Sequence, residues 1–288
     1  MGIALLFLIF VLWGALMTPL SIKLAYRYGL MDYPDQRKIH HDPVPRGAGL
    51  VLWAGFMLWA LLFSEVSYGL KVVVSGATLV FFAGYIDDML SMSPFGRLAV
   101  HFAAAALSLV LTGQQSVLRL GLYLFWVAGV TNAYNFIDGM NGLALSMAAL
   151  SLSFIGFMSG SLWIVPVVAM ILGILPWNFP KAKTFLGDGG VYLLGYLTAT
   201  TAMLWLSPME LDFGKLCAAL LLVGGVPVID TLVAITRRVL AGKSPFYPDR
   251  GHIHHRLLDH GCPPEIALAI LALFQCSSLF AAHFLLKK

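Results

Sequence analysis

The stretch GMNGLALSMAALSLSFIGFMSGSLWIVPVVAMILGILPWNFP, residues 139–180, decides the fold class of this chain. It holds no Asp, Glu, Lys or Arg. Because one transmembrane helix needs only about 20 apolar residues, this stretch is long enough to cross a bilayer twice, with a turn near residues 159–161. Unbroken apolar runs of this length favour helices over barrel strands, which alternate in short segments.

The whole chain has the same bias. Its 288 residues are 59% hydrophobic and 11% charged, whereas soluble domains carry roughly 25% charged residues. We therefore expect one transmembrane domain over residues 1–288, an all-α integral membrane protein built as a polytopic bundle of about ten transmembrane helices. The expected spans are 3–24, 48–63, 70–86, 98–113, 117–134, 142–158, 161–177, 190–207, 214–236 and 265–285.

The basic residues predict how these spans are oriented. If the spans alternate, 13 of the 18 Lys and Arg residues fall on one side and 5 on the other. The richer side should be cytoplasmic, with both chain ends outside. Lys23 and Arg27 follow the first apolar run, which favours a retained helix over a cleaved signal peptide. The three cysteines stand singly and predict neither a disulfide nor a zinc site.

The motifs that carry chemistry are expected on the basic side. The third span ends in FAGYIDDML, where the adjacent carboxylates of Asp87 and Asp88 repel each other. Either a divalent cation compensates this repulsion or water solvates an interfacial pair. In FLGDGG, residues 185–190, Asp188 lies on a glycine-rich turn before a helix. We expect Asp188 to bind Mg²⁺ and its glycines to make room for a diphosphate.

Two further segments add amides and histidines. In NAYNFIDGMNGLA, residues 132–144, amides and a carboxylate recur at every third position, on one face of a helix. They could bind a cation, read a nucleobase or cap a helix end. The segment GHIHHRLLDHG, residues 251–261, predicts a cationic clamp for a pyrophosphate. His101 and His283 are expected to be packed residues, and Asp230 is left outside the site, with either a functional or a structural role near Arg237.

With these motifs, together with RKIHHDPVPRGAG and PVIDT, the chain resembles the polyprenyl-phosphate N-acetylhexosamine-1-phosphate transferases of glycosyltransferase family 4. The resemblance covers nearly the whole chain, and the order of the motifs makes it specific. It implies catalytic roles for Asp87, Asp88, Asp138 and His254, and a metal site at Asp188 and Asn135. The substrate-binding residues that it implies are Asn132, Asn141, His252, His255, Arg256, Lys38, His40 and Arg46. Asn141, Val191 and Ala48 depart from the family's usual residues.

The resemblance also implies a reaction. A UDP-N-acetyl sugar and undecaprenyl phosphate would give a lipid diphosphate sugar and UMP, the first membrane step of cell-envelope polysaccharide synthesis. The HIHH form favours N-acetylglucosamine as the sugar. The implied cofactor is Mg²⁺, with Mn²⁺ as the alternative ion. The implied active site is on the cytoplasmic face of the inner membrane. No nucleic-acid partner is expected, and a homodimer stays open.

Two other classes of membrane protein fit the sequence less well. A cation- or proton-coupled transporter usually has internal repeats and ionisable groups near the bilayer midplane, whereas this chain has no visible repeat and places its acids near one surface. A CDP-alcohol phosphotransferase would need a compact acidic signature within one helix pair, and this signature is absent from the sequence.

Overall fold

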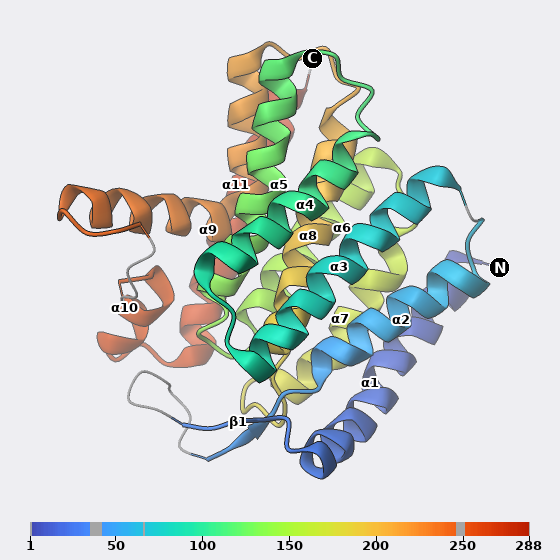
Figure 1. Cartoon of the computed structure of the whole chain (residues 1–288), viewed down its shortest axis with the longest axis vertical. Helices are drawn as coiled ribbons and strands as arrows, with labels where there is room; N and C mark the ends of the chain where they lie inside the picture. The colour runs from blue at the N-terminus through green and yellow to red at the C-terminus, as the bar shows by residue number, and fades with distance from the viewer. Residues whose placement is uncertain (1, 35–41, 66, 246–250, 288) are drawn as a thin grey trace.

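The computed structural model describes residues 2–34, 42–65, 67–245 and 251–287, which form a helical bundle (Figure 1). This part of the chain contains eleven helices and a short hairpin, in which β1 (Met31–Asp32) pairs antiparallel with β2 (Val44–Pro45). The helices are α1 (Ile3–Tyr28), α2 (Ala48–Leu62), α3 (Tyr68–Leu90), α4 (Pro94–Leu109), α5 (Val117–Ile137), α6 (Leu143–Ser159), α7 (Ile164–Asn178), α8 (Gly187–Leu206), α9 (Phe213–Leu240), α10 (Ile253–Asp259) and α11 (Pro264–Leu286). Each predicted span matches one helix, and the short α10 was not predicted.

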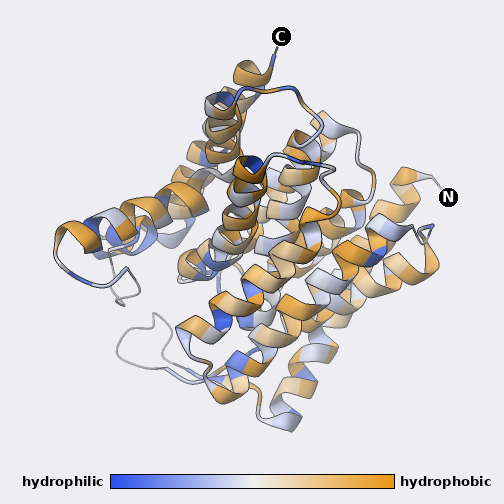
Figure 2. Ribbon diagram, turned by 45° about the horizontal axis from the view of Figure 1, so that its top comes forward, coloured by the Kyte–Doolittle hydropathy of each residue, from blue (hydrophilic) through white to orange (hydrophobic). Residues whose placement is uncertain are grey.

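The helices have the lengths and surfaces of a membrane protein. Among the described residues, α1, α3, α8, α9 and α11 are long and apolar enough to cross a membrane, and α2, α4, α6 and α7 are shorter apolar helices. Figure 2 shows hydrophobic residues along most of their length. Large apolar side chains such as Leu8, Leu12 and Leu16 of α1 are exposed on the outside of the bundle, where lipid is the favourable solvent. The prediction of an all-α, multi-pass membrane protein is confirmed.

α8 is the centre of the bundle. In the most apolar 18-residue window of each helix, 94% of α8 is buried, against 17% of α1. It packs against α2, α3, α5 and α6. The first turn of α8 therefore has a position set by several neighbouring helices at once.

Glycines allow α8 to enter this crowded position. A Cβ at Gly84 of α3 would lie 2.4 Å from the backbone nitrogen of Gly189, and a Cβ at Gly49 of α2 would lie 2.7 Å from that of Gly190. Small residues permit such close backbone contact between membrane helices. The expectation that Gly189 and Gly190 make room for a diphosphate is therefore wrong, because both glycines face neighbouring helices.

Two helix boundaries also differ from the prediction. α8 begins at Gly187, so Asp188 lies in the first helical turn rather than on a flexible turn before the helix. α5 ends at Ile137, and Asp138 is its C-terminal cap. The one-face pattern expected from the regular spacing therefore stops before Asn141.

The polar motifs gather at one end of the bundle. The β1–β2 hairpin, the connection before α8 and the helix α10 lie at this end, and both chain ends lie away from it (Figure 1). Arg46 forms a parallel bridge with Phe185, and the backbone nitrogen of Phe185 donates to Pro45 O at 2.8 Å. Segments 140 residues apart are thereby joined at the start of α8.

The close approach of α3 and α8 gives a stability prediction. Gly84→Ala should lower the free energy of unfolding by about 1–3 kcal/mol, the usual cost of overpacking. Gly121→Ala is the matched control, because a Cβ at Gly121 of α5 would meet nothing within 4 Å. Thermal unfolding in detergent, followed by circular dichroism, compares the two variants. Equal melting temperatures would contradict the assigned contact.

Candidate active site

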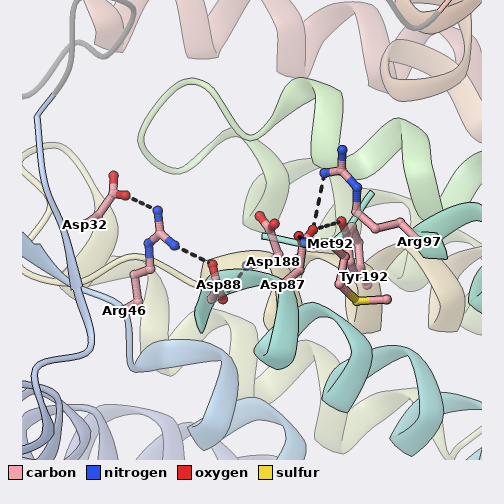
Figure 3. A network of polar contacts seen from close by, with 8 residues as sticks. All are labelled: Asp32, Arg46, Asp87, Asp88, Met92, Arg97, Asp188 and Tyr192. Atoms are coloured by element: carbon pink, nitrogen blue, oxygen red, sulfur yellow. Dashed lines mark hydrogen bonds and ion pairs between the residues drawn. The ribbon is translucent and has the colours of Figure 1, made fainter. Parts of the chain in front are cut away.

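Asp87 and Asp88 are adjacent in the last turn of α3, but they have different partners (Figure 3). Asp87 Oδ1 accepts from the backbone nitrogen of Met92 at 2.6 Å. Asp87 Oδ2 accepts from Arg97 Nη1 at 3.2 Å and from the Tyr192 hydroxyl at 3.1 Å. Three donors, from the connection after α3, from α4 and from α8, therefore hold Asp87, whose residue surface is only 7% exposed.

Asp88 binds the N-terminus of α8. Its Oδ2 accepts from the backbone nitrogen of Asp188 at 2.9 Å, and its Oδ1 accepts from Arg46 Nη1 at 2.7 Å. The first backbone N–H groups of a helix have no partner within the helix and favour a negative charge. A protein carboxylate, rather than a phosphate, therefore takes this donor of the GDGG segment.

Arg46 joins two carboxylates across the site. Its Nη1 contacts Asp88, and its Nη2 forms an ion pair with Asp32 of β1. Asp32 is 6% exposed, whereas the Arg46 side chain is partly exposed, so only one partner of this pair lies out of solvent. Arg46 was predicted to bind substrate, and the structure shows it as the counter-ion of two acids. The other predicted residues of the early loop, Lys38 and His40, lie outside the described residues.

The carboxylate of Asp188 differs from its neighbours. It is half-buried and lies beside the carboxylates of Asp87 and Asp88 (Figure 3), close enough for mutual repulsion. Within the described ranges it forms no ion pair with a cationic side chain, and its side chain lies within hydrogen-bonding distance of the Asp87 carboxylate. Unlike Asp87 and Asp88, Asp188 is thus not paired with an arginine, and its carboxylate is available to an added ligand.

The amide segment contributes to the same end of the bundle. Gly195 of α8 packs against Thr131 and Tyr134 of α5, so the last turn of α5 and the first turn of α8 lie at one level because the two helices run in opposite directions. Asp138 is exposed and within electrostatic range of Asp88.

The three amides have different surroundings. Asn132 and Asn135 are half-buried on α5. Asn141 donates its Nδ2 hydrogen to Pro180 O at 3.0 Å. The adjacent Gly142 donates its backbone hydrogen to Asn178 Oδ1 at 2.6 Å. Asn141 therefore holds the connection before α8, and a substrate contact at this residue stays a prediction.

The histidine segment meets the end of α5. A Cβ at Gly139 would lie 2.4 Å from His254 Nε2 and 3.2 Å from His255 Nε2, so the two segments are in close contact. His254 is fully buried, and neither ring nitrogen has a hydrogen-bond partner in the described structure. Burial lowers the pKa of His254 to about 3, and the proximity of His255 adds to this effect. His254 is therefore neutral near pH 7 and cannot act as a cationic clamp.

His252 and Arg256 complete the segment. Both ring nitrogens of His252 contact residues of α9, Asp230 and Arg238. Arg256 lines a cavity of about 110 Å³ between α9, α10 and α11, next to apolar residues such as Leu271 and Phe274. The two residues thus face different surroundings.

Four residues of this site were not among the predicted site residues: Asp32, Arg97, Tyr192 and Asp230. Tyr192 follows Asp188 by four positions, so helical spacing could have placed both on one face of α8. Asp230 was noticed as an acid within a span, but its partner is His252, whereas Arg237 donates to Gly251 O. Asp32 and Arg97 have no local signal that separates them from ordinary surface charges.

Fold and site together define a multi-pass membrane protein with an acidic, arginine-bridged site at one end of its helical bundle. Comparison with known proteins places the chain more narrowly. The description "Glycosyl transferase family 4" belongs to the family model that matches residues 70–206, which include Asp87, Asp88, Asp138 and Asp188.

Relatives extend this match over most of the chain. A Bacillus subtilis protein named "Probable undecaprenyl-phosphate N-acetylglucosaminyl 1-phosphate transferase" is 31% identical over 93% of this chain and 80% of its own length. A Mycolicibacterium smegmatis decaprenyl-phosphate N-acetylglucosaminephosphotransferase is 31% identical over 87% of this chain and 74% of its own length. A Thermotoga maritima undecaprenyl-phosphate alpha-N-acetylglucosaminyl 1-phosphate transferase is 30% identical over 85% of this chain and 79% of its own length. The chain therefore belongs to glycosyl transferase family 4, as its motifs predicted.

The double contact of Arg46 gives a second stability prediction. Arg46→Met should leave Asp88 and Asp32 without their shared cation and cost about 1–2 kcal/mol of unfolding free energy, less than a fully buried pair because Arg46 is partly exposed. Arg46→Lys should lie between wild type and Arg46→Met, because one ammonium replaces two guanidinium donors. Chemical denaturation in detergent measures the series. Adding Asp88→Asn to Arg46→Met should recover part of the loss, and full additivity of the two losses would contradict the pairing.

Proposed function

We propose that this protein transfers an N-acetylhexosamine 1-phosphate, with N-acetylglucosamine as the sugar, from a UDP-sugar to undecaprenyl phosphate. An oxygen of the lipid phosphate attacks the sugar-bound phosphorus, the bond from this phosphorus to the UMP oxygen breaks, and UMP leaves. The product is a lipid diphosphate sugar, the first lipid-linked intermediate of a cell-envelope polysaccharide. The single observation that carries the proposal is the convergence of Asp88, Asp188 and Arg46 at the bundle end that also holds His254.

The residues present fit a magnesium ion. Around Asp88, five carboxylates (Asp32, Asp87, Asp88, Asp138 and Asp188) face two guanidinium groups (Arg46 and Arg97). This excess of negative charge would repel two anionic substrates. No group of three or more His, Cys, Asp or Glu in the described residues could enclose a metal ion by itself. Mg²⁺ does not need one, because it usually takes one or two carboxylates and completes its shell with phosphate oxygens and water.

In this proposal Asp188 holds the ion, with Asn135 as a second candidate ligand on the adjacent helix end. When bound, Mg²⁺ supplies positive charge that neutralises the diphosphate. Asp88 holds the first turn of α8 and so orients Asp188. Arg46 and Arg97 position the two acids of α3.

The hydrogen bonds of Asp87 and Asp88 support direct displacement. A phosphorylated-aspartate route through the pair on α3 would need one of these two carboxylates free to attack phosphorus. The oxygens of Asp87 accept three hydrogen bonds, and those of Asp88 accept two from Arg46 and Asp188. The lipid phosphate is already anionic at neutral pH, since its second proton leaves near pH 6, and a strong base is not required. Orientation and charge neutralisation then account for most of the catalysis.

The orientation in the membrane belongs to the same proposal. The site lies on connections that alternating spans place on the side with 13 of the 18 Lys and Arg residues, which supports a cytoplasmic active site in the inner membrane. The gathering of acids at one end, rather than along the spans, disfavours the transporter alternative.

The test is an assay of lipid-linked product. Purified protein, undecaprenyl phosphate, Mg²⁺ and radiolabelled UDP-N-acetylglucosamine should give a labelled lipid and UMP, with other UDP-N-acetyl sugars in parallel. Asp188→Asn should reduce the rate by about a hundredfold or more, since metal charge stabilisation is worth several kcal/mol. Glu210→Gln is the matched control, because Glu210 is exposed in the connection between α8 and α9, away from the site.

Three outcomes would count against parts of the proposal. No labelled lipid with any UDP-sugar would remove the activity itself. Full turnover by Asp188→Asn at limiting Mg²⁺ would remove the metal assignment. Radiolabelled phosphate bound covalently to the protein after incubation with a β-³²P-labelled UDP-sugar alone would overturn direct displacement.

A further inference from the structure

His252 has no ring nitrogen left for a substrate. Its Nδ1 lies 2.8 Å from Asp230 Oδ2, and its Nε2 lies 3.2 Å from Arg238 Nη2. A guanidinium group can only donate, so Nε2 must accept and the ring proton must lie on Nδ1, where it donates to Asp230. His252 is 4% exposed and Arg238 is also 4% exposed, so these contacts are made out of solvent.

Asp230 also holds the backbone of the same segment. Its Oδ1 accepts from the backbone nitrogen of Ile253 at 3.0 Å, at the start of α10. Both oxygens of one buried carboxylate therefore bind consecutive residues of the histidine segment. A shift of α10 would break both contacts together.

We propose that Asp230 and His252 are positioning residues, which hold α10 so that His254 lies against Gly139 at the active site. This inference rests on the proposed transferase function. It changes the role predicted for His252, which becomes a structural link between α9 and α10 rather than a contact for the diphosphate. It also brings Asp230, an acid within a predicted span, into the catalytic arrangement through its partners.

The packing of the histidine rings that follow His252 leaves the ring of His254 little freedom to move. The rings of His252 and His254 have centroids 6.0 Å apart with an interplanar angle of 18°, and those of His254 and His255 are 4.2 Å apart. Gly139 lies directly against His254, so that a Cβ at this position would displace the ring. Because a misplacement of about 1 Å can cost about a hundredfold in rate, the contact of Asp230 with His252 has a direct effect on the reaction.

The segment of α9 that carries Asp230 is itself held in place by contacts inside the bundle. α9 is broken at Gly225, whose φ of 52° and ψ of −131° suit glycine. Gln275 of α11 is fully buried; its Oε1 accepts from the backbone nitrogen of Val226 at 2.8 Å, and its Nε2 donates to Ser151 Oγ at 3.0 Å. The break therefore has its polar groups bound within the protein, as membrane helices require. The second half of α9, which carries Asp230, leaves the bundle in a defined direction and lies above α10 in Figure 1.

The test separates a positioning role from a ligand role. His252→Asn places an amide donor near the position of Nδ1 and keeps the bond to Asp230, whereas His252→Leu removes it. We expect His252→Asn to retain at least about a third of the wild-type kcat. His252→Leu and Asp230→Asn should lose about tenfold or more, the usual effect of a broken hydrogen bond to a buried charged group. The loss should fall on kcat, with the KM for the UDP-sugar changing less than about threefold, because neither residue touches the substrate.

Glu265→Gln is the matched control, an acid-to-amide change at an exposed position of α11, and it should leave both constants unchanged. If His252→Asn is as inactive as His252→Leu, or if KM rises as much as kcat falls, His252 contacts the substrate and the proposal is overturned.

A second measurement does not depend on activity. Histidine-selective ¹⁵N NMR of the full-length protein in lipid should show His252, assigned by its absence in His252→Asn, with the proton on Nδ1. Asp230→Asn should shift this resonance. A wild-type proton on Nε2 would overturn the proposal. If the wild type makes no lipid-linked sugar but His252 shows the expected proton, the transferase function fails while the contact between α9 and α10 stands.

Discussion

The active-site end depends on the hydrogen bond between the Asp88 carboxylate and the backbone N–H group of Asp188, in the first turn of α8. This contact joins the end of α3 to the start of the central helix, and it is possible because glycines let the two backbones approach closely. Since a helix N-terminus carries a partial positive charge, the contact also stabilises the ionised form of a carboxylate at the edge of the bundle. It places Asp188, whose carboxylate forms no ion pair with an arginine in the described part of the chain, beside Asp87 and Asp88.

The sequence predicted the spans well because the signal for them is local. Each uncharged run is long enough to be recognised by itself, and turn residues separate the runs. The prediction failed where one helix meets another. The glycines of GDGG were interpreted as a flexible phosphate loop, but Gly189 packs against α3 and Gly190 against α2. No pattern within residues 185–190 contains this information, since the contacting residues lie about 100 or 140 positions earlier in the chain.

In the candidate site, too, local features were predictable from the sequence and contacts between helices were not. The sequence placed Asp87 and Asp88 together as one acidic pair, but successive side chains on a helix point about 100° apart. Asp87 therefore faces Arg97 and Tyr192, and Asp88 faces Arg46 and α8. The residue types and the order of the motifs were sufficient to predict the family. The partners that assign a role to each residue come from other helices, and only the folded chain brings them together.

The balance of charge explains why so many polar groups are needed for a reaction that requires no strong base. Two anionic substrates must approach one another at the edge of a membrane, where the low dielectric strengthens every repulsion. A site made of arginines alone would bind diphosphate without preparing a place for a metal ion, whereas a site made of carboxylates alone would repel both substrates. Here Arg46 and Arg97 balance part of the acid cluster and leave Asp188 without an arginine ion pair among the described residues. In the proposed reaction, the remaining negative charge would favour a cation at Asp188. Because Mg²⁺ usually completes its shell with phosphate oxygens, an ion held at Asp188 would couple metal binding to donor binding in this proposal.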